Sequence, residues 1–142
     1  MTNLSARRAI ITISLFIYAV CLSMDSICTT DGCSNWPAWG ILLFGWIVMF
    51  SSFANFLWIA NPLYFFSLIY FYKERIARAV ILSFVSFIFG LSFVWCKYIL
   101  VNESGYLSII TGTEVGYWVW ISCFFSTFVA MLIYRFKVKT EL

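Results

Sequence analysis

The residues best suited to chemistry in this sequence are its five cysteines, because the chain has no histidine. Cys28 and Cys33 bracket the segment Thr29-Thr30-Asp31-Gly32. We place this segment outside a membrane, in an oxidising compartment where two cysteines commonly pair. A tetrahedral metal cage needs more thiol or imidazole ligands than the chain offers. We therefore expect a Cys28–Cys33 disulfide, and neither a metal nor another cofactor.

Other catalytic arrangements are poorly supported. Without histidine, the Ser/His/Asp and Cys/His arrangements cannot form within this chain, and no phosphate-cradling glycine loop is present. Glu114 could handle protons, but Thr111-Gly112-Thr113-Glu114 matches a capping box. In that motif Thr111 caps a helix N-terminus and Glu114 reaches back to its backbone N–H. We expect the capping role, and we expect no enzyme activity.

Composition predicts the elements that would position these residues. Hydrophobic residues make up 63% of the chain and charged residues 11%, whereas about a quarter are charged in soluble domains. The chain is therefore expected to lie in a lipid bilayer as one membrane domain, 1–142. Four apolar segments, at about 9–25, 38–60, 76–96 and 115–134, predict an all-α antiparallel bundle of four transmembrane helices. The first segment also resembles a signal peptide, but it lacks a good cleavage site and we expect it to be retained.

The second span is the difficult one, because residues 36–72 contain no charge. A straight helix over this run would be about 55 Å long, against about 30 Å of hydrocarbon. A residue before proline is pushed away from helical angles, so Asn61-Pro62 is predicted to mark the helix boundary. Residues 63–72 would then lie in the interfacial zone. The alternative is a kinked helix that continues past Pro62.

Charge predicts the orientation of the bundle. Of the nine Lys and Arg residues, all but Lys97 fall on the side of the two termini. The positive-inside rule therefore places both termini in the cytoplasm. The net charge of +3 then reflects orientation, and we expect no nucleic-acid partner.

Polar residues within the spans are expected to face the bundle. They either bond between helices or line a lumen, and Asn55 in particular is expected to bond between helices. In the third span Ala79, Ser83, Ser86 and Gly90 recur at heptad-like spacing, which predicts a helix contact. The charged residues Asp25 and Arg78 lie only at the ends of predicted spans and none lies in the middle of one, so an ion-coupled carrier acting alone is not expected. The bundle-polar or lumen candidates are Ser51, Ser52, Asn55, Ser83, Ser86 and Ser126.

In its length, four spans and inward termini, the chain is similar in topology to immunity proteins that protect bacterial inner membranes against pore-forming toxins. The similarity is one of topology and includes no shared residue motif. It implies a small, non-catalytic plasma-membrane protein, in a bacterial inner membrane, that binds a membrane-protein partner or itself, as an immunity, exclusion or accessory subunit does.

Two alternatives remain open. One is a homo-oligomeric channel or transport subunit, for which the polar stripes would face an open lumen. The other is a membrane thiol-disulfide oxidoreductase, because quinone-linked disulfide-forming enzymes share the four-span architecture and carry cysteine pairs in their outer loops. A binding protein instead predicts that the polar stripes close upon each other.

Overall fold

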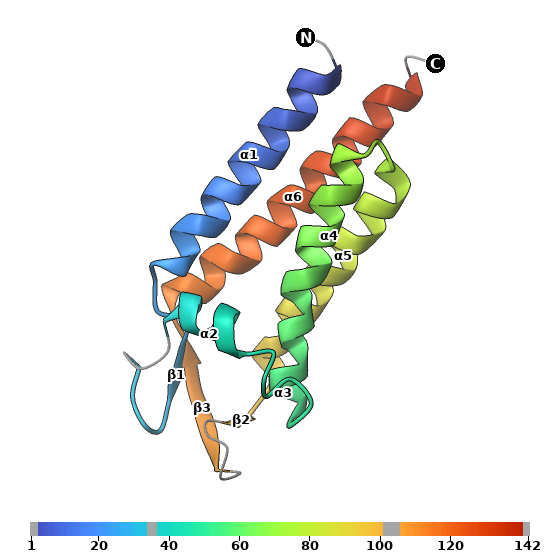
Figure 1. Cartoon of the computed structure of the whole chain (residues 1–142). Helices are drawn as coiled ribbons and strands as arrows, with labels where there is room; N and C mark the ends of the chain where they lie inside the picture. The colour runs from blue at the N-terminus through green and yellow to red at the C-terminus, as the bar shows by residue number, and fades with distance from the viewer. Residues whose placement is uncertain (1–2, 34–36, 101–105, 141–142) are drawn as a thin grey trace.

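The computed structural model describes residues 3–33, 37–100 and 106–140, and this part of the chain is mostly helical (Figure 1). Four helical stretches are long and apolar enough to cross a membrane, and they run antiparallel. Both termini and the turn between the second and third stretches lie at one end. The stretches are built from α1 (Asn3–Leu22), α3–η1–α4 (Phe53–Phe56, Leu57–Ile59, Ala60–Tyr72), α5–η2 (Ile76–Ser92, Phe93–Trp95) and α6 (Val115–Thr140).

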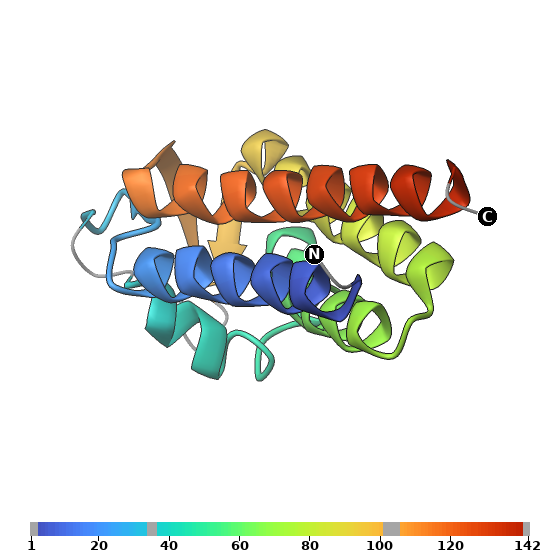
Figure 2. The ribbon, with the colours of Figure 1, turned by 90° about the horizontal axis from the view of Figure 1, so that it is seen from above.

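The helices pack in a circuit. Seen from above, α1 lies beside α6, α6 beside α5, and α5 beside α4 (Figure 2). One face of α5 is buried, as the heptad-like spacing predicts, and it carries Ala79, Ser83, Ser86 and Gly90. The fourth side of the circuit, between α1 and α4, has the fewest contacts. The short helix α2 (Ala38–Phe44) lies on the outside there.

The second membrane-length helix is Phe53–Tyr72, which corrects the predicted span 38–60 and the predicted interfacial segment 63–72. Residues 38–44 form only the short helix α2, and residues 45–51 form turns. Asn61 and Pro62 lie in the first turn of α4, inside this helix and not at its end. The alternative of a helix that continues past Pro62 is the one that the structure adopts.

The helix continues through Pro62 because the hydrogen bond that proline removes is replaced locally. A proline at position 62 lacks the N–H that would donate to the Trp58 carbonyl four residues earlier. Residues Leu57–Ile59 tighten into a 3₁₀ turn, and the Asn61 side-chain amide donates to the Trp58 carbonyl at 3.2 Å. Membrane helices tolerate proline where such adjustments satisfy the freed carbonyl.

A small antiparallel sheet covers the other end of the bundle, and it corrects the expectation of an all-α fold. Its strands β1 (Ile27–Thr29), β3 (Leu107–Thr113) and β2 (Tyr98–Leu100) lie in that order, so the sheet joins the segment that follows α1 to the segment between α5 and α6. Thr111 belongs to β3, so it does not cap α6. The backbone N–H of Glu114 donates instead to the Ser26 carbonyl at 2.9 Å. Three strands packed on helices suffice for a stable sheet where a lone hairpin is marginal.

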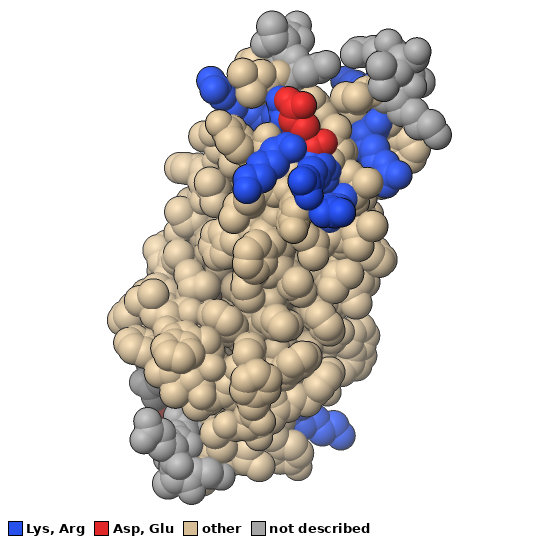
Figure 3. Space-filling model, turned by 45° about the vertical axis from the view of Figure 1, so that its right-hand side comes forward, with Lys and Arg blue, Asp and Glu red and all other residues tan. Residues whose placement is uncertain are grey.

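Basic side chains gather at the end that carries the termini (Figure 3). Arg7 is buried there, and its guanidinium donates to Glu74 at 2.6 Å and to the Tyr72 carbonyl at 3.0 Å. These bonds tie α1 to the turn between α4 and α5. Lys97 lies at the sheet end, next to β2. The charge separation that the sequence predicted is thus present in the folded chain.

Candidate functional site

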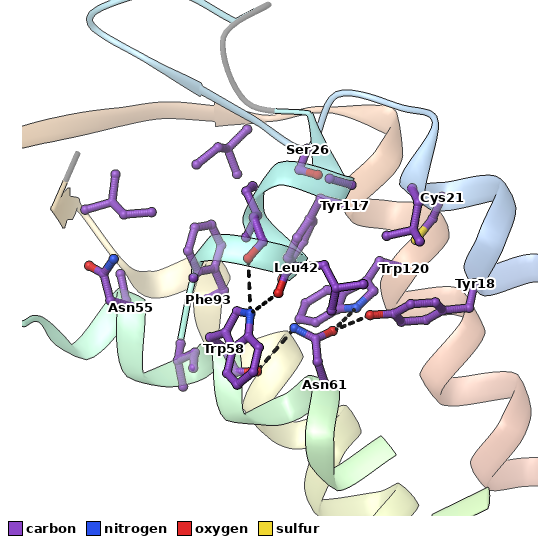
Figure 4. Close-up of a pocket in the computed structure, with 18 residues that line it drawn as sticks. Tyr18, Cys21, Ser26, Leu42, Asn55, Trp58, Asn61, Phe93, Tyr117 and Trp120 are labelled. Atoms are coloured by element: carbon purple, nitrogen blue, oxygen red, sulfur yellow. Dashed lines mark hydrogen bonds between the residues drawn. The ribbon is translucent and has the colours of Figure 1, made fainter. Parts of the chain in front are cut away.

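The bundle contains a cavity of about 100 Å³ near its sheet end (Figure 4). Tyr18 of α1, Asn61 of α4 and Trp120 of α6 meet at one end of it, which we call the deep end (Figure 4). Ser26, which follows α1, lies away from that end, and Ile27 also lines the cavity. The lining is mostly aliphatic and aromatic and includes no Lys, Arg, Asp or Glu. An apolar cavity with a few convergent polar groups is the usual form of a small-molecule site.

Asn61 joins three parts of the fold at the deep end. Its side-chain oxygen accepts hydrogen bonds from the Tyr18 hydroxyl at 2.8 Å and from the Trp120 indole N–H at 3.0 Å. Its amide group donates to the Trp58 carbonyl, as described above. Asn61 is buried, with 5% of its surface exposed. An amide in lipid loses its hydrogen bonds, and here three elements supply them.

The wall of the cavity on the α2 side is held by Trp58. The Trp58 indole N–H donates to the carbonyls of Ile41 and Leu42, both at 3.1 Å. These carbonyls belong to the last turn of α2, where several carbonyls have no donor within the helix; the Ile41 carbonyl also accepts from the Gly45 backbone N–H at 2.9 Å. Gly45 lies against the same ring, and a Cβ there would come within 2.3 Å of Trp58 Cδ1. The contact between α2 and the bundle therefore depends on a glycine at position 45.

Aromatic side chains fill the centre of the bundle beyond Asn61. The Tyr64 ring stacks on Tyr18 and on Phe124, with centroid separations of 5.2 and 4.8 Å. The Tyr64 hydroxyl shares hydrogen bonds with Ser14, which also bonds to Thr127. All five residues are buried. The polar groups at this level are therefore bonded to one another and line no open path.

The serines predicted to face the bundle divide into two groups. Ser83 and Ser86 are buried; the Ser83 hydroxyl donates to the Val80 carbonyl of its own helix, whereas Ser86 donates across to the Ala60 carbonyl at 2.7 Å. Ser51 and Ser126 lie on the exposed surface, which corrects their predicted placement. Ser126 bonds within its own helix, to the Cys123 carbonyl. The exposed pair does not extend the buried pair into a stripe.

Asn55 does not bond between helices, which corrects its predicted role. Its side-chain oxygen accepts from the Leu100 backbone N–H at 3.1 Å and from the Ser52 hydroxyl. The Ser52 hydroxyl in turn caps α3 by accepting from the Asn55 N–H. Because α3 begins at Phe53, Asn55 lies near the start of the second membrane-length helix, at its sheet end. It therefore connects the second helix to the sheet.

Cys28 and Cys33 are bonded, with an S–S distance of 2.10 Å. The backbone reverses between them, because Thr29 and Gly32 exchange hydrogen bonds at 3.1 and 3.0 Å, and Gly32 has a positive φ of 124°, which glycine adopts readily. Glu114 Oε1 lies 2.8 Å from Cys28 Sγ. These three side chains could hold a metal by proximity alone, but two bonded sulfurs supply no thiolate.

The remaining thiols are separate from the disulfide. Cys21 and Cys123 are each 0% exposed, and Cys96 is half-buried. Cys96 lies just beyond the third span, and burial raises the pKa of its thiol above the ordinary value. A raised pKa lowers the thiolate fraction at neutral pH and hence the nucleophilicity of the group. Cys96 is thus poorly suited to thiol exchange.

The outward face of the hairpin β2–β3 is apolar. Tyr98 pairs with Ile109 and Leu100 with Leu107. Tyr98, Leu107 and Ile109 are 54%, 49% and 49% exposed, whereas Ile99 and Ser108 on the opposite face are buried. This is the alternation of a strand with one packed face. We call Tyr98, Leu107 and Ile109 the outer strip.

Sequence reasoning identified Asn61 but not its partners. Tyr18, Trp58 and Trp120 lie 43, 3 and 59 residues from Asn61 along the chain, and each reads alone as an ordinary membrane aromatic residue. The sequence did offer one indication of a buried hydrogen-bonding site, because the Asn61 amide lies in an apolar run and a polar side chain there must find partners. The neighbouring Pro62 instead led to the prediction that Asn61 lies at a helix end.

Comparisons with protein-family models, with curated proteins and with solved structures gave no match. Function is therefore inferred from the chain's own residues.

Proposed function

We propose that this chain is a non-catalytic, multi-pass protein of a plasma membrane, a bacterial inner membrane, and that it acts by binding a membrane-protein partner or a second copy of itself. Immunity, exclusion and accessory-subunit proteins work in this way. The basic end faces the cytoplasm under the positive-inside rule. The sheet and α2 then lie toward the outer side.

One observation carries this proposal: the centre of the bundle is closed. Tyr18, Tyr64 and Phe124 stack across it, and Ser14 bonds to Tyr64 and Thr127. A channel through a single bundle would need polar groups facing open space at this level. In the described part of the chain these groups bond to each other, which is the arrangement that a binding protein predicts.

The outer strip is the surface best suited to a partner. Contiguous apolar residues exposed on a folded surface mark interaction sites, and Tyr98, Leu107 and Ile109 lie on adjacent strands. The strip is rigid because β3 is paired on both sides, to β2 and to the disulfide-linked strand β1. A surface already held in its binding conformation loses little entropy when a partner binds.

The test is site-specific photo-crosslinking in intact cells. A photoreactive residue at position 109 should give a discrete protein adduct, whose mass distinguishes another protein from a second copy of the chain. The matched control is position 133, because Ile133 is similarly exposed, at 52%, on the helix α6. Replacing Tyr98 and Leu107 by serine should abolish the adduct from position 109 without unfolding the chain, because both side chains are exposed.

Three outcomes would contradict the proposal. The first is the absence of a discrete adduct from position 109 in a folded, membrane-inserted chain. The second is ion flux through liposomes that contain only the purified chain, which would favour the homo-oligomeric channel. The third is turnover of a dithiol substrate that is lost in Cys28→Ser, which would favour the thiol-disulfide oxidoreductase.

A further inference from the structure

The cavity is dry in character. Its polar side chains are mostly engaged with protein: Asn61 with Tyr18 and Trp120, and the Tyr117 hydroxyl with the Gly90 carbonyl at 2.9 Å. A buried water needs two to four polar partners. Among the lining side chains of the described residues, the Ser26 hydroxyl and the weakly polar Cys21 thiol have no hydrogen-bond partner. One hydroxyl is too little to hold water, so the space favours an apolar occupant.

The cavity is partly open to the surface, and a thin wall covers it on the α2 side. Ala38, Ile41 and Leu42 of α2 line it, and α2 has no buried residue. Beyond this wall, side chains of α2 and the following turn are 51–84% exposed, and none carries charge: Trp39, Leu43, Phe44, Trp46, Ile47 and Phe50. Such a surface is soluble in hydrocarbon and costly to expose to water. Acyl chains are therefore the neighbours that this wall is built to meet.

The wall is also weakly attached. Its polar attachments within the described residues are few: the Trp58 indole donates to the Ile41 and Leu42 carbonyls, and the Ala38 backbone N–H donates to the Met24 carbonyl at 3.1 Å. Elements with few buried contacts open at low free-energy cost. Behind α2, the contact between α1 and α4 is the least extensive in the helix circuit. Displacement of α2 would open the cavity sideways, toward the bilayer.

We propose that this cavity is a binding site for the end of a membrane lipid's acyl chain, which enters beneath α2. A dry cavity of about 150 Å³ can bind benzene, so about 100 Å³ is suited to the last few carbons of a chain. Trp120 and Phe93 supply flat apolar surface to the chain. Opening and closing of α2, through the Trp58 hydrogen bonds, controls access.

The test uses a phospholipid with a diazirine on its terminal chain carbon, reconstituted with the full chain and photolysed. Two cysteines serve as matched reporters, since Cys21 and Cys123 are both 0% exposed but only Cys21 lines the cavity. Adducts are located by fragmentation mass spectrometry. The proposal expects label on Cys21 and none on Cys123, with exposed residues such as Phe84 labelled in every sample.

Variants make the test specific. Two variants fill the cavity from its lining: Ala54→Leu and, in case that chain does not fold, Ala38→Leu. Either variant should reduce the labelling of Cys21 to the level of Cys123. Ala77→Leu, at an exposed site on α5, should leave the labelling of Cys21 unchanged. Trp58→Phe should increase it by releasing α2. Unlabelled Cys21 beside labelled Phe84, or equal labelling in the filled variants, would overturn the proposal.

Discussion

Asn61 is the residue whose replacement is expected to disturb the bundle most for the smallest change in volume. Asn61→Leu keeps a side chain of similar size but removes one acceptor and one donor group. The Tyr18 hydroxyl and the Trp120 indole N–H would lose their acceptor, and the Trp58 carbonyl would lose the donor that replaces the missing N–H of Pro62. All three groups lie within the helical bundle and are buried or half-buried.

The expected loss of stability follows from these bonds. Hydrogen bonds between membrane helices contribute about 0.6 kcal/mol on average and about 1.7 at most. With three bonds lost, we expect the free energy of unfolding to fall by about 2 kcal/mol. The loss approaches about 4 kcal/mol if the freed donors find no other acceptor, because an unpaired buried group costs about 1–3 kcal/mol.

The assay is a double-mutant cycle, with unfolding measured by denaturing-detergent titration in mixed micelles. Tyr18→Phe removes the hydroxyl but keeps the ring that stacks on Tyr64. Combined with Asn61→Leu, it should show an interaction energy of about 0.6–1.7 kcal/mol. The control pair is Tyr18→Phe with Ser83→Ala, because Ser83 bonds only within its own helix, and it should be additive. An Asn61–Tyr18 interaction energy no larger than that of the control pair would refute the reasoning.

Two further predictions concern a glycine contact and the thiols. Gly116→Ala should destabilise the chain by about 1–3 kcal/mol, the usual cost of overpacking, because its Cβ would lie 2.5 Å from the Asp25 carbonyl oxygen; Gly112→Ala, which meets no atom within 4 Å, should be nearly neutral in the same titration. Alkylation of the folded, unreduced chain should add one label by mass spectrometry, on Cys96, because Cys28 and Cys33 are bonded and the other two thiols are buried. Burial raises the pKa of Cys96, so its alkylation rate should still be rising at pH 9; a rate that levels off below pH 8, or label on Cys21 or Cys123, would contradict this.

The second span shows where sequence reasoning was insufficient. Hydropathy does not distinguish 38–60 from 53–72, because both lie in one charge-free run. The prediction that the helix ends at Asn61-Pro62 rested on the local rule that a residue before proline avoids helical angles. The helix nevertheless continues, because the Asn61 amide donates to the Trp58 carbonyl and residues 57–59 tighten into a 3₁₀ turn. That compensation is invisible until the conformation of the turn is known.

The capping box was misread for a similar reason. Thr111-Gly112-Thr113-Glu114 has the residue types of a helix start, but Thr111 lies within strand β3, and its neighbours Gly112 and Thr113 pair with strand β1, more than eighty residues earlier. Local propensity competes with long-range strand pairing, and here the pairing wins. The role of Asn55 was also predicted wrongly because its partner is distant in the sequence: its side-chain oxygen accepts from the backbone N–H of Leu100 in β2.

The sequence by itself determined that this chain forms four membrane-length apolar helices, with its basic residues at one end and Cys28 opposite Cys33. Those properties depend on composition, on summed hydropathy and on short spacings, which are local quantities. Tertiary structure decided which part of residues 36–72 forms the second helix, that the outer loops pair as a sheet, and that Tyr18, Asn61 and Trp120 meet at a cavity. A polar group buried in lipid must be paired, but only the packed fold brings its partner from α1 or α6 within hydrogen-bonding distance.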